Sequence, residues 1–409
     1  GSLYAEDVDT ALLAKRYGTP LFVYSRRTII EHFRKIKAAF AGIDPLICYS
    51  VKANSNVSIL KVMKDEGAGF DIVSGGELYR VLLTGADPKK IVYAGVGKTK
   101  EEIEYALKAG ILMFNAESAG ELKAINAAAK KARKTASVAL RINPDVDART
   151  HRYITTAKKE NKFGIDIVLA HSLFNAAKKY RHIAIKGIDM HIGSQITTVQ
   201  PYIDAIAKLK KFIAQLRREG HAVEYFNLGG GMGVIYDEEK PATADMFASA
   251  VRPHIEGLDV KLIMEPGRFI IGNAGILVSS VIYVKKGINK DFLIVDAAMN
   301  DLLRPSLYSA YHRIIPVAPQ KGKDRVYDIV GPICESGDFL GKDRRLPVLK
   351  EGGLIAVRTA GAYGMAMSSN YNSRPRAAEV LVSGSAHRLI RARETYRDIV
   401  AKEIKVNPK

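Results

Sequence analysis

The feature that most constrains the fold is an alternation of short apolar runs with stretches of helical periodicity. Eight strand-like runs occur in order: ICYSV (47–51), FDIV (70–73), IVYA (91–94), LMF (112–114), SVALRI (137–142), KGIDMHI (186–192), EYFNL (224–228) and KLIME (261–265). Helical stretches separate them, and several end at a glycine, as helix C-termini often do. This alternation predicts a parallel sheet, and eight strands close a (β/α)8 TIM-type barrel of the α/β class.

An open, doubly wound sheet is the alternative that the same alternation allows. Two segments suited to phosphate binding follow the seventh and eighth strand-like runs, LGGGMG (228–233) and EPGR (265–268). Barrels place phosphate sites after these two strands. We therefore favour the barrel.

The pattern changes after about residue 275, where strand-like runs are separated by Gly, Pro and Asp with little helix between them. TPLFVYS (19–25) is a strand without a βα partner, and we expect it to pair with these later strands. A charged helix is predicted near 386–402. We predict a barrel over 26–275, and a β-sandwich or β-barrel domain made of 1–25 and 276–409.

Composition excludes some functional classes. The formal net charge is +19 over 409 residues, but acidic residues are interleaved with the lysines and arginines, and no zinc-finger spacing or basic arm is present. We therefore expect a solvated basic surface and no nucleic-acid partner. Two cysteines, Cys48 and Cys334, make no disulfide framework, so we expect a cytoplasmic protein with Cys48 in the core. We expect neither a membrane span nor a metal site.

Lys52 follows the first strand-like run, in YSVKAN (49–54). A lysine carried into a partly apolar barrel mouth loses hydration, which disfavours its charged form and leaves a nucleophilic amine. This position suggests a phosphorylated carbonyl cofactor held by the lysine as a Schiff base. A solvated, inert lysine is the alternative, and the surrounding motifs decide against it.

The two phosphate-suited segments each offer backbone amides. The successive glycines of LGGGMG let backbone N–H groups approach a phosphate, although a tight turn is also consistent with this run. In EPGR, the amides of Gly267 and Arg268 are candidates for the same phosphate. Glu265 would project into the barrel mouth, where a carboxylate suits the pyridine nitrogen of pyridoxal 5'-phosphate.

Two further strand ends carry candidate residues. HIGSQ (191–195) ends the sixth strand, where His191 would lie flat on a planar cofactor ring and Ser194 would donate to the phosphate. Asp71, in FDIVSGGEL (70–78), would hydrogen-bond in the mouth beside Lys52. For His191 the alternative is a hydrogen-bonded core histidine, and for Asp71 it is a cap of the following helix.

These motifs together resemble the diaminopimelate decarboxylases, a pyridoxal-phosphate family with an alanine-racemase-like barrel. The resemblance also includes NKFGI (161–165), MNDLLRPSLY (299–308), GPICESGDFL (331–340) and GAYG (361–364), in the expected order over nearly the whole chain. It implies a β domain that pairs two chains head to tail. It also implies a homodimer in which each active site is completed by residues of the partner.

The resemblance assigns roles by motif. Lys52 would bind the cofactor covalently and His191 would stack on its ring, with Asp71 and Tyr363 near it and Glu265 at the pyridine nitrogen. The phosphate would be surrounded by Ser194, Gly230, Gly231, Gly233, Gly267 and Arg268. The substrate would be held by Arg268, Arg304, Tyr308, Glu335 and Tyr363, and Cys334 would donate the proton.

The implied reaction is decarboxylation of meso-2,6-diaminopimelate to L-lysine and carbon dioxide, the last step of lysine biosynthesis. The residues agree with this substrate, because Arg304 offers a fork for a remote carboxylate and Glu335 an acid for the distal ammonium. The alternatives are a decarboxylase of the same fold acting on carboxynorspermidine, ornithine or arginine, and a catalytically silent relative that binds a partner protein.

Overall fold

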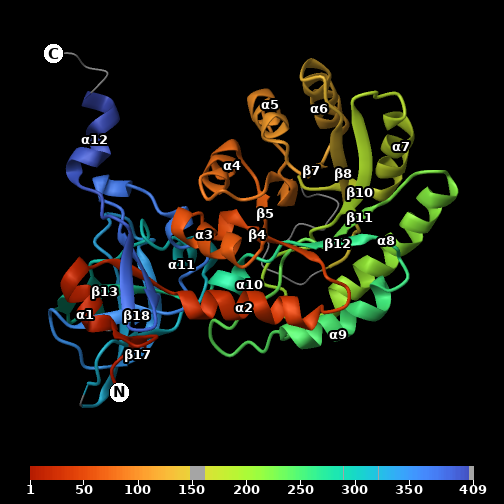
Figure 1. Cartoon of the computed structure of the whole chain (residues 1–409). Helices are drawn as coiled ribbons and strands as arrows, with labels where there is room; N and C mark the ends of the chain where they lie inside the picture. The colour runs from red at the N-terminus through yellow and green to blue at the C-terminus, as the bar shows by residue number, and fades with distance from the viewer. Residues whose placement is uncertain (148–161, 289, 321, 405–409) are drawn as a thin grey trace. The chain divides into compact units, whose positions relative to one another are not determined.

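The computed structural model describes residues 1–147, 162–288, 290–320 and 322–404 (Figure 1). The chain divides into two compact units. Unit 1 consists of residues 1–31, 235–239 and 270–409, and unit 2 of residues 32–234 and 240–269. The boundaries at residues 25 and 275 that the sequence suggested stay a prediction. Asn161, which begins the NKFGI motif, lies outside the described residues.

Unit 2 contains a closed barrel of eight parallel strands among its described residues. The strands are β4 (Leu46–Ser50), β5 (Gly69–Ile72), β6 (Ile91–Tyr93), β7 (Met113–Ala116), β8 (Ala136–Asn143), β10 (Ile183–Asp189), β11 (Tyr225–Asn227) and β12 (Lys261–Met264). Each pairs with its neighbour along the chain, β12 pairs with β4, and β10 pairs with β8, which closes the barrel. A two-residue strand, β9 (Ile165–Asp166), pairs with β8. All eight predicted barrel strands are confirmed.

Helices surround the strands of unit 2 (Figure 1). They are α2 (Arg26–Ala39), which begins in unit 1, α3 (Val57–Asp65), α4 (Gly75–Leu82), α5 (Lys100–Ala109), α6 (Ala119–Lys131), α7 (Ile167–Ala177), α8 (Gln200–Arg218), α9 (Ala244–Ile255) and α10 (Arg268–Ile271). Local sequence explains their ends: Thr99 and Glu102 form a capping box at the start of α5, and Gly110 ends it in the left-handed conformation. Short 3-10 turns are η1 (Val51–Ala53) and η2 (Pro88–Lys90).

The barrel interior is apolar toward the amino ends of the strands and polar toward their carboxyl ends. The apolar part is a buried cluster made of Cys48, Val92, Met113, Ala139 and Ile263. Successive inward side chains of a strand are two residues apart. Two residues further along four of these strands, the interior is lined by buried polar side chains, those of Ser50, Asn115, Arg141 and Glu265. Burial raises the pKa of the Cys48 thiol well above its usual value, which fits its predicted place in the core.

Unit 1 is built around a mixed sheet and a separate two-stranded sheet. The two-stranded sheet consists of β1 (Tyr4–Ala5) and β2 (Val8–Asp9). The strands of the mixed sheet are β3 (Leu21–Ser25), β13 (Gly275–Lys285), β14 (Asp291–Val295), β15 (Ile314–Pro316), β16 (Asp324–Val330), β17 (Phe339–Pro347), β18 (Leu354–Val357), β19 (Ala378–Ser383) and β20 (Ala386–Arg391). Its helical segments are α1 (Thr10–Tyr17), α11 (Arg304–Tyr308), α12 (Tyr396–Ile404), η3 (Met365–Met367) and η4 (Tyr371–Ser373). β3 pairs with β13 and β19, so the early strand joins the later ones as predicted.

The predicted helix near 386–402 is wrong over its first part. Residues 386–391 form β20, which pairs antiparallel with β19 through a short turn at Gly384, and only 396–404 are helical. β20 carries several charged side chains and is largely exposed, so it lacks the apolar alternation by which a strand is recognised.

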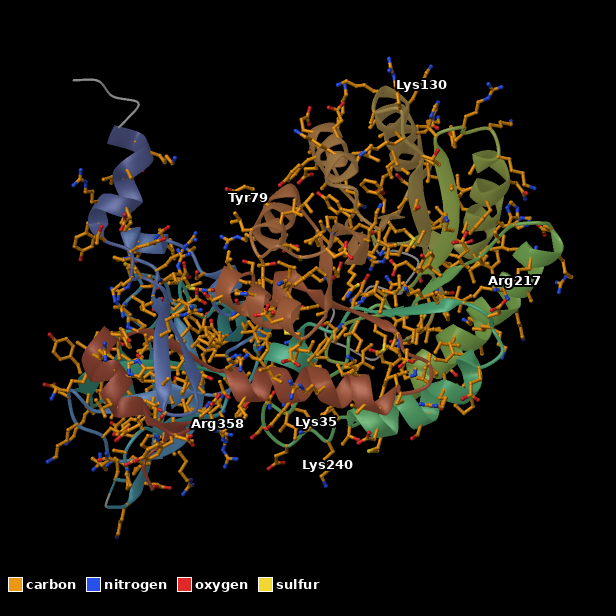
Figure 2. All side chains as sticks on the ribbon, viewed as in Figure 1. Lys35, Tyr79, Lys130, Arg217, Lys240 and Arg358 are labelled. Carbon is orange, nitrogen blue, oxygen red and sulfur yellow. The ribbon has the colours of Figure 1, made fainter. Side chains whose placement is uncertain are left out.

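The surface carries many of the basic side chains. Lys35, Lys130 and Lys240 are exposed, and Figure 2 shows Lys130 and Lys240 extending away from the ribbon. This exposure agrees with the solvated basic surface expected from the sequence. None of the helices in the described ranges is both long enough and apolar enough to cross a membrane.

Candidate active site

Lys52 lies in η1, directly after β4, at the carboxyl end of the barrel strands. Its side chain is 33% exposed, and its Nζ donates to Asp71 Oδ2 at 2.6 Å. Ser50 Oγ donates to the same oxygen at 2.7 Å. Asp71 thus holds the Lys52 side chain in place at the barrel mouth, and the nucleophilic amine expected from the sequence stays a prediction.

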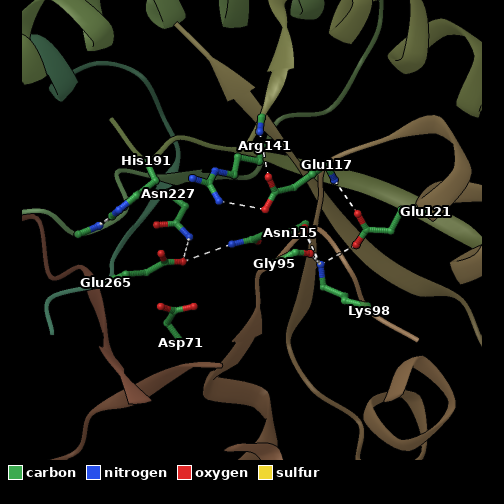
Figure 3. A network of polar contacts seen from close by, with 12 residues as sticks. Asp71, Gly95, Lys98, Asn115, Glu117, Glu121, Arg141, His191, Asn227 and Glu265 are labelled. Atoms are coloured by element: carbon green, nitrogen blue, oxygen red, sulfur yellow. Dashed lines mark hydrogen bonds and ion pairs between the residues drawn. The ribbon is translucent and has the colours of Figure 1, made fainter. Parts of the chain in front are cut away.

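Glu265 follows β12 and is 4% exposed. Its Oε1 accepts hydrogen bonds from Asn227 Nδ2 at 2.5 Å and from Asn115 Nδ2 at 3.3 Å (Figure 3). Burial, followed by the charges of Asp71 and Asp189, raises the pKa of Glu265 well above its usual value. The Lys52 charge and the Asn227 hydrogen bond oppose this shift. Glu265 is thus a buried carboxyl group whose proton affinity depends on its neighbours.

Asp189 and Arg141 lie side by side on β10 and β8, where they are paired in register. Burial raises the pKa of Asp189 to about 7, and the Arg141 charge opposes the shift. Arg141 Nη1 donates to Glu117 Oε1 at 2.9 Å, and both residues are buried (Figure 3). Glu117 also accepts from the Gly164 N–H at 2.9 Å. A buried cation is thereby fixed at the barrel mouth.

The run LGGGMG approaches neighbouring backbone closely. A β-carbon at Gly230 would overlap the carbonyl oxygen of Glu265, and one at Gly231 would overlap that of Gly193. Gly231 also has a φ of +103°, which side chains rarely adopt. The Gly230 N–H donates to His191 Nδ1, and the Gly233 N–H donates to the carbonyl of Ile196. Glycine is therefore required here for close packing, and the amides of Gly229, Gly230 and Gly233 already have acceptors in the protein.

His191 lies after β10 and is partly buried. Because the Gly230 N–H donates to Nδ1 at 3.2 Å, this nitrogen is an acceptor, and the ring proton is assigned to Nε2. Burial, assisted by the charges of Arg141 and Lys52, lowers the pKa of His191 well below its usual value. The ring is therefore neutral at physiological pH.

The structure brings Arg268 and Ser194 together at the same end of the barrel. Arg268 Nη2 donates to Ser194 Oγ at 2.9 Å, and Arg268 is 6% exposed. A β-carbon at Gly267 would lie 2.9 Å from that of Ser50, so this turn packs tightly beside the segment that holds Lys52. All predicted site residues of unit 2 therefore lie at or just beyond the carboxyl ends of the strands.

Arg304 begins α11 in unit 1 and is 5% exposed. Its Nη1 lies 2.8 Å from His312 Nε2, and His312 Nδ1 lies 2.9 Å from the Arg358 carbonyl oxygen. A carbonyl only accepts, so Nδ1 carries the proton and Nε2 accepts from Arg304. The guanidinium also lies over the Tyr236 ring, 4.5 Å from its centroid. Two neighbours thus fix the direction of this buried cation.

The other predicted residues of unit 1 are more accessible. Cys334 and Glu335 are exposed, and Tyr308 and Tyr363 are partly buried. The Cys334 N–H donates to Asn372 Oδ1 at 2.8 Å, and Tyr371 Oη donates to Glu335 Oε2 at 3.4 Å. Among the residues that the structure describes, no group of three or more His, Cys, Asp or Glu side chains is arranged to hold a metal ion.

Several polar residues beside the predicted ones were not expected from the sequence. In unit 2 they are Asn115, Glu117, Arg141, Asp189 and Asn227, and in unit 1 Tyr236 and His312 lie beside Arg304. The first five occupy or follow inward positions near the ends of strands. A polar residue two positions after a buried apolar one in a barrel strand is the signal that identifies Asn115, after Met113, and Arg141, after Ala139.

Comparison with known proteins agrees with this arrangement. Residues 26–272 match the family described as pyridoxal-dependent decarboxylase, pyridoxal binding domain. The chain is 49% identical to the diaminopimelate decarboxylase of Pseudomonas aeruginosa over 98% of its own length and 96% of that protein. It is 50% identical to the Neisseria meningitidis enzyme of the same name, over 98% and 99% of the two lengths.

Solved structures agree with the sequence relatives. The crystal structure of diaminopimelate decarboxylase from Helicobacter pylori, complexed with L-lysine, superposes with a TM-score of 0.94 at 42% identity. The match covers 97% of this chain and 100% of that one. The chain therefore belongs to the diaminopimelate decarboxylases, a branch of the pyridoxal-dependent decarboxylase family.

Proposed function

We propose that the chain decarboxylates meso-2,6-diaminopimelate to L-lysine and carbon dioxide, with pyridoxal 5'-phosphate as its cofactor. The observation that carries the proposal is the convergence of one amine, Lys52, one buried carboxyl group, Glu265, and one neutral imidazole, His191, on the same end of a barrel. The similarity to diaminopimelate decarboxylases over nearly the whole chain supports the choice of substrate.

The residues present fit this cofactor. The glycine run carries no side chains at positions 229–231, so its backbone can be approached closely by a phosphate. Arg268 and Ser194 supply a cation and a hydroxyl beside it. Lys52 supplies the amine for covalent attachment. When bound, pyridoxal phosphate supplies the electron-withdrawing ring that makes loss of an α-carboxylate possible.

Each predicted site residue of unit 2 then has a defined task. Lys52 would hold the cofactor, and the Asp71 carboxylate keeps the lysine amine in position through the 2.6 Å contact. Glu265 would interact with the ring nitrogen. His191 would pack on the ring and, being neutral, would add no charge there. We assign the phosphate to Ser194, Gly231, Gly267 and Arg268, with Gly230 and Gly233 shaping the loop.

The far end of the substrate is assigned to unit 1. Arg304 binds the remote carboxylate together with Tyr308, because a guanidinium fixed by His312 and Tyr236 is already oriented to form two parallel hydrogen bonds. Arg268 is a second candidate for this carboxylate, and Tyr363 lies near the cofactor or substrate. Glu335 binds the distal ammonium. Substrates without a remote carboxylate, such as ornithine, gain nothing from Arg304.

We further propose a homodimer in which Cys334 and Glu335 act in the site of the partner subunit, where the Cys334 thiol supplies the proton that replaces the lost carboxylate. The exposure of both side chains in the single chain supports this. Subunit complementation tests it: Lys52→Ala and Cys334→Ala are each inactive, and after mixing and exchange roughly a quarter of the sites become intact. If mixed variants stay inactive although exchange is demonstrated, the sites are not shared.

The reaction is tested by measuring carbon dioxide released from meso-diaminopimelate, ornithine and arginine, with and without added pyridoxal phosphate. Of the three amino acids, we expect only diaminopimelate to be decarboxylated. We also expect Lys52→Ala to lack the visible absorbance of the bound cofactor. Preferred turnover of ornithine or arginine would instead identify a basic amino-acid decarboxylase. Unchanged diaminopimelate turnover in Arg304→Ala would show the carboxylate assignment to be wrong. The cytoplasmic location expected from the sequence stays a prediction, which cell fractionation tests.

A further inference from the structure

The carboxamide of Asn227 joins two parts of the barrel mouth that have separate tasks. Asn227 ends β11 and is fully buried. Its Oδ1 accepts from the Gly229 N–H at 2.9 Å, and its Nδ2 donates to Glu265 Oε1 at 2.5 Å. One side chain therefore contacts both the glycine run and the carboxyl group of Glu265, and Figure 3 shows the second of these contacts.

The orientation of this amide is not ambiguous. An N–H group can only donate, so the atom of Asn227 that faces the Gly229 N–H must be the oxygen. The NH2 group is then directed at Glu265, which must present an acceptor oxygen to it. The Glu265 N–H in turn donates to the carbonyl of Gly229 at 2.8 Å. Asn227, Gly229 and Glu265 thus form a closed ring of hydrogen bonds across the ends of β11 and β12.

The ring extends to the histidine. Gly229 has a φ of +66°, and a β-carbon there would overlap the carbonyl oxygen of Met190, so only glycine fits. The next amide, that of Gly230, donates to His191 Nδ1 at 3.2 Å. Displacing Gly229 would therefore move the histidine that covers the cofactor as well as the carboxyl group.

We propose that Asn227 is a positioning residue that holds Glu265 as a hydrogen-bond acceptor, with Oε2 directed at the cofactor's ring nitrogen, and ties this orientation to the glycine run. This inference rests on the proposed use of pyridoxal phosphate. Asn115 donates to the same oxygen at the longer distance of 3.3 Å and has no bond to the glycine run, which makes it the matched control.

The need for such a residue follows from the charges that face Glu265 from the neighbouring strands. Asp71 on β5 and Asp189 on β10 disfavour a second anion, whereas Lys52 in η1 favours it. Arg141 on β8 is directed toward Glu117. Among the groups at Glu265, the Asn227 amide is the short neutral donor, and it stabilises the carboxylate without adding charge.

The test titrates cofactor-free protein with pyridoxal phosphate and follows its visible absorbance at pH 6 and pH 8. Asn227→Asp keeps the acceptor for Gly229 but replaces the donor with a second carboxylate beside Glu265, and two adjacent carboxylates share a proton at lower pH. We expect cofactor affinity to fall at least tenfold at pH 8 and by a smaller factor at pH 6. Asn115→Ala should weaken binding less, by the same factor at both pH values.

Adding Glu265→Gln to Asn227→Asp restores a donor–acceptor pair, with the introduced glutamine amide now donating to the introduced aspartate carboxylate. The loss of affinity relative to wild type should then be the same at both pH values. A loss in Asn227→Asp that is equal at both pH values, or no larger than that in Asn115→Ala, would overturn the inference. If Asn227→Asp does not fold, Asn227→Ala is measured with and without Glu265→Gln. A smaller loss in the presence of Glu265→Gln supports action through Glu265, and additive losses refute it. Failure of the wild-type protein to bind the cofactor would refute the proposed function instead.

Discussion

The buried ion pair between Lys98 and Glu121 gives the sharpest prediction about stability. Lys98 Nζ donates to Glu121 Oε1 at 2.5 Å and to the carbonyls of Gly95 and Asn115, each at 2.8 Å. The two side chains are only 1% and 7% exposed. Lys98→Met would therefore leave one buried carboxylate without its cation and two carbonyls without their donor.

Removing one partner of a buried ion pair costs about 3–5 kcal/mol, because the remaining charge is left unpaired in a poorly solvated place. For a domain of 150–250 residues this corresponds to a fall of roughly 6–20 °C in Tm. The loss should exceed that of a surface pair. Lys131 Nζ lies 3.0 Å from Glu104 Oε1 with 69% of the lysine side chain exposed, so Lys131→Met should cost about 0–1 kcal/mol.

The assay is thermal and urea unfolding of the cofactor-free proteins, followed by far-ultraviolet circular dichroism because the chain has no tryptophan. Lys98→Met combined with Glu121→Gln should recover part of the loss, since no unpaired charge is then buried. If Lys98→Met were no more destabilising than Lys131→Met, the view that this pair is an integral part of the barrel would be refuted.

Three further perturbations have defined outcomes. Burial raises the pKa of Glu77 from 4.5 to about 7, so the folded protein keeps a proton that the unfolded chain releases as pH rises between these values, and the stability of the fold decreases. The stability of Glu77→Gln relative to wild type should therefore increase by roughly 2–3 kcal/mol between pH 5 and pH 8. A stability difference from urea unfolding that does not vary with pH would contradict this. Gly230→Ala should weaken cofactor binding at least tenfold, because its β-carbon would overlap the Glu265 carbonyl oxygen. Gly76→Ala should not, because its β-carbon would lie 3.7 Å from Ser74 Oγ. Equal cofactor affinities of the two variants would contradict this explanation. His312→Phe removes the hydrogen-bond acceptor that orients Arg304, so the KM for diaminopimelate should rise by a larger factor than kcat falls. If steady-state kinetics showed a larger change in kcat than in KM, the role of His312 in orienting Arg304 would be rejected.

The barrel was predictable because its signals are local. Each strand is a short apolar run, and each helix between strands has its own periodicity, so neither depends on distant residues. β20 was missed for the same reason. Its Arg388 and Arg391 lie on an exposed strand at the edge of the sheet, and only its pairing with β19 identifies it.

The candidate site was predictable where short motifs carried it, and not where its contacts join distant elements. Lys52, Glu265 and His191 were each found from their own sequence neighbourhood. The contacts of Lys98 with Glu121, and of Glu117 with Arg141, join residues 23 and 24 positions apart, so no local pattern reports them. The tautomer of His312 likewise follows only from Arg358, which lies 46 positions away.

Asn115 and Arg141, which were not predicted, nevertheless follow from the pleat of the strands, as Glu265 does. Inward side chains are two residues apart, and the change from apolar to polar occurs between Met113 and Asn115, between Ala139 and Arg141, and between Ile263 and Glu265. A strand that only filled a core would stay apolar. Because these polar side chains are 0–6% exposed, solvent does not explain them, and an unpartnered buried polar group costs about 1–3 kcal/mol. A simultaneous change to polar residues in several buried strands therefore indicates a layer that is stabilised by its own hydrogen bonds and by the group that it is built to hold.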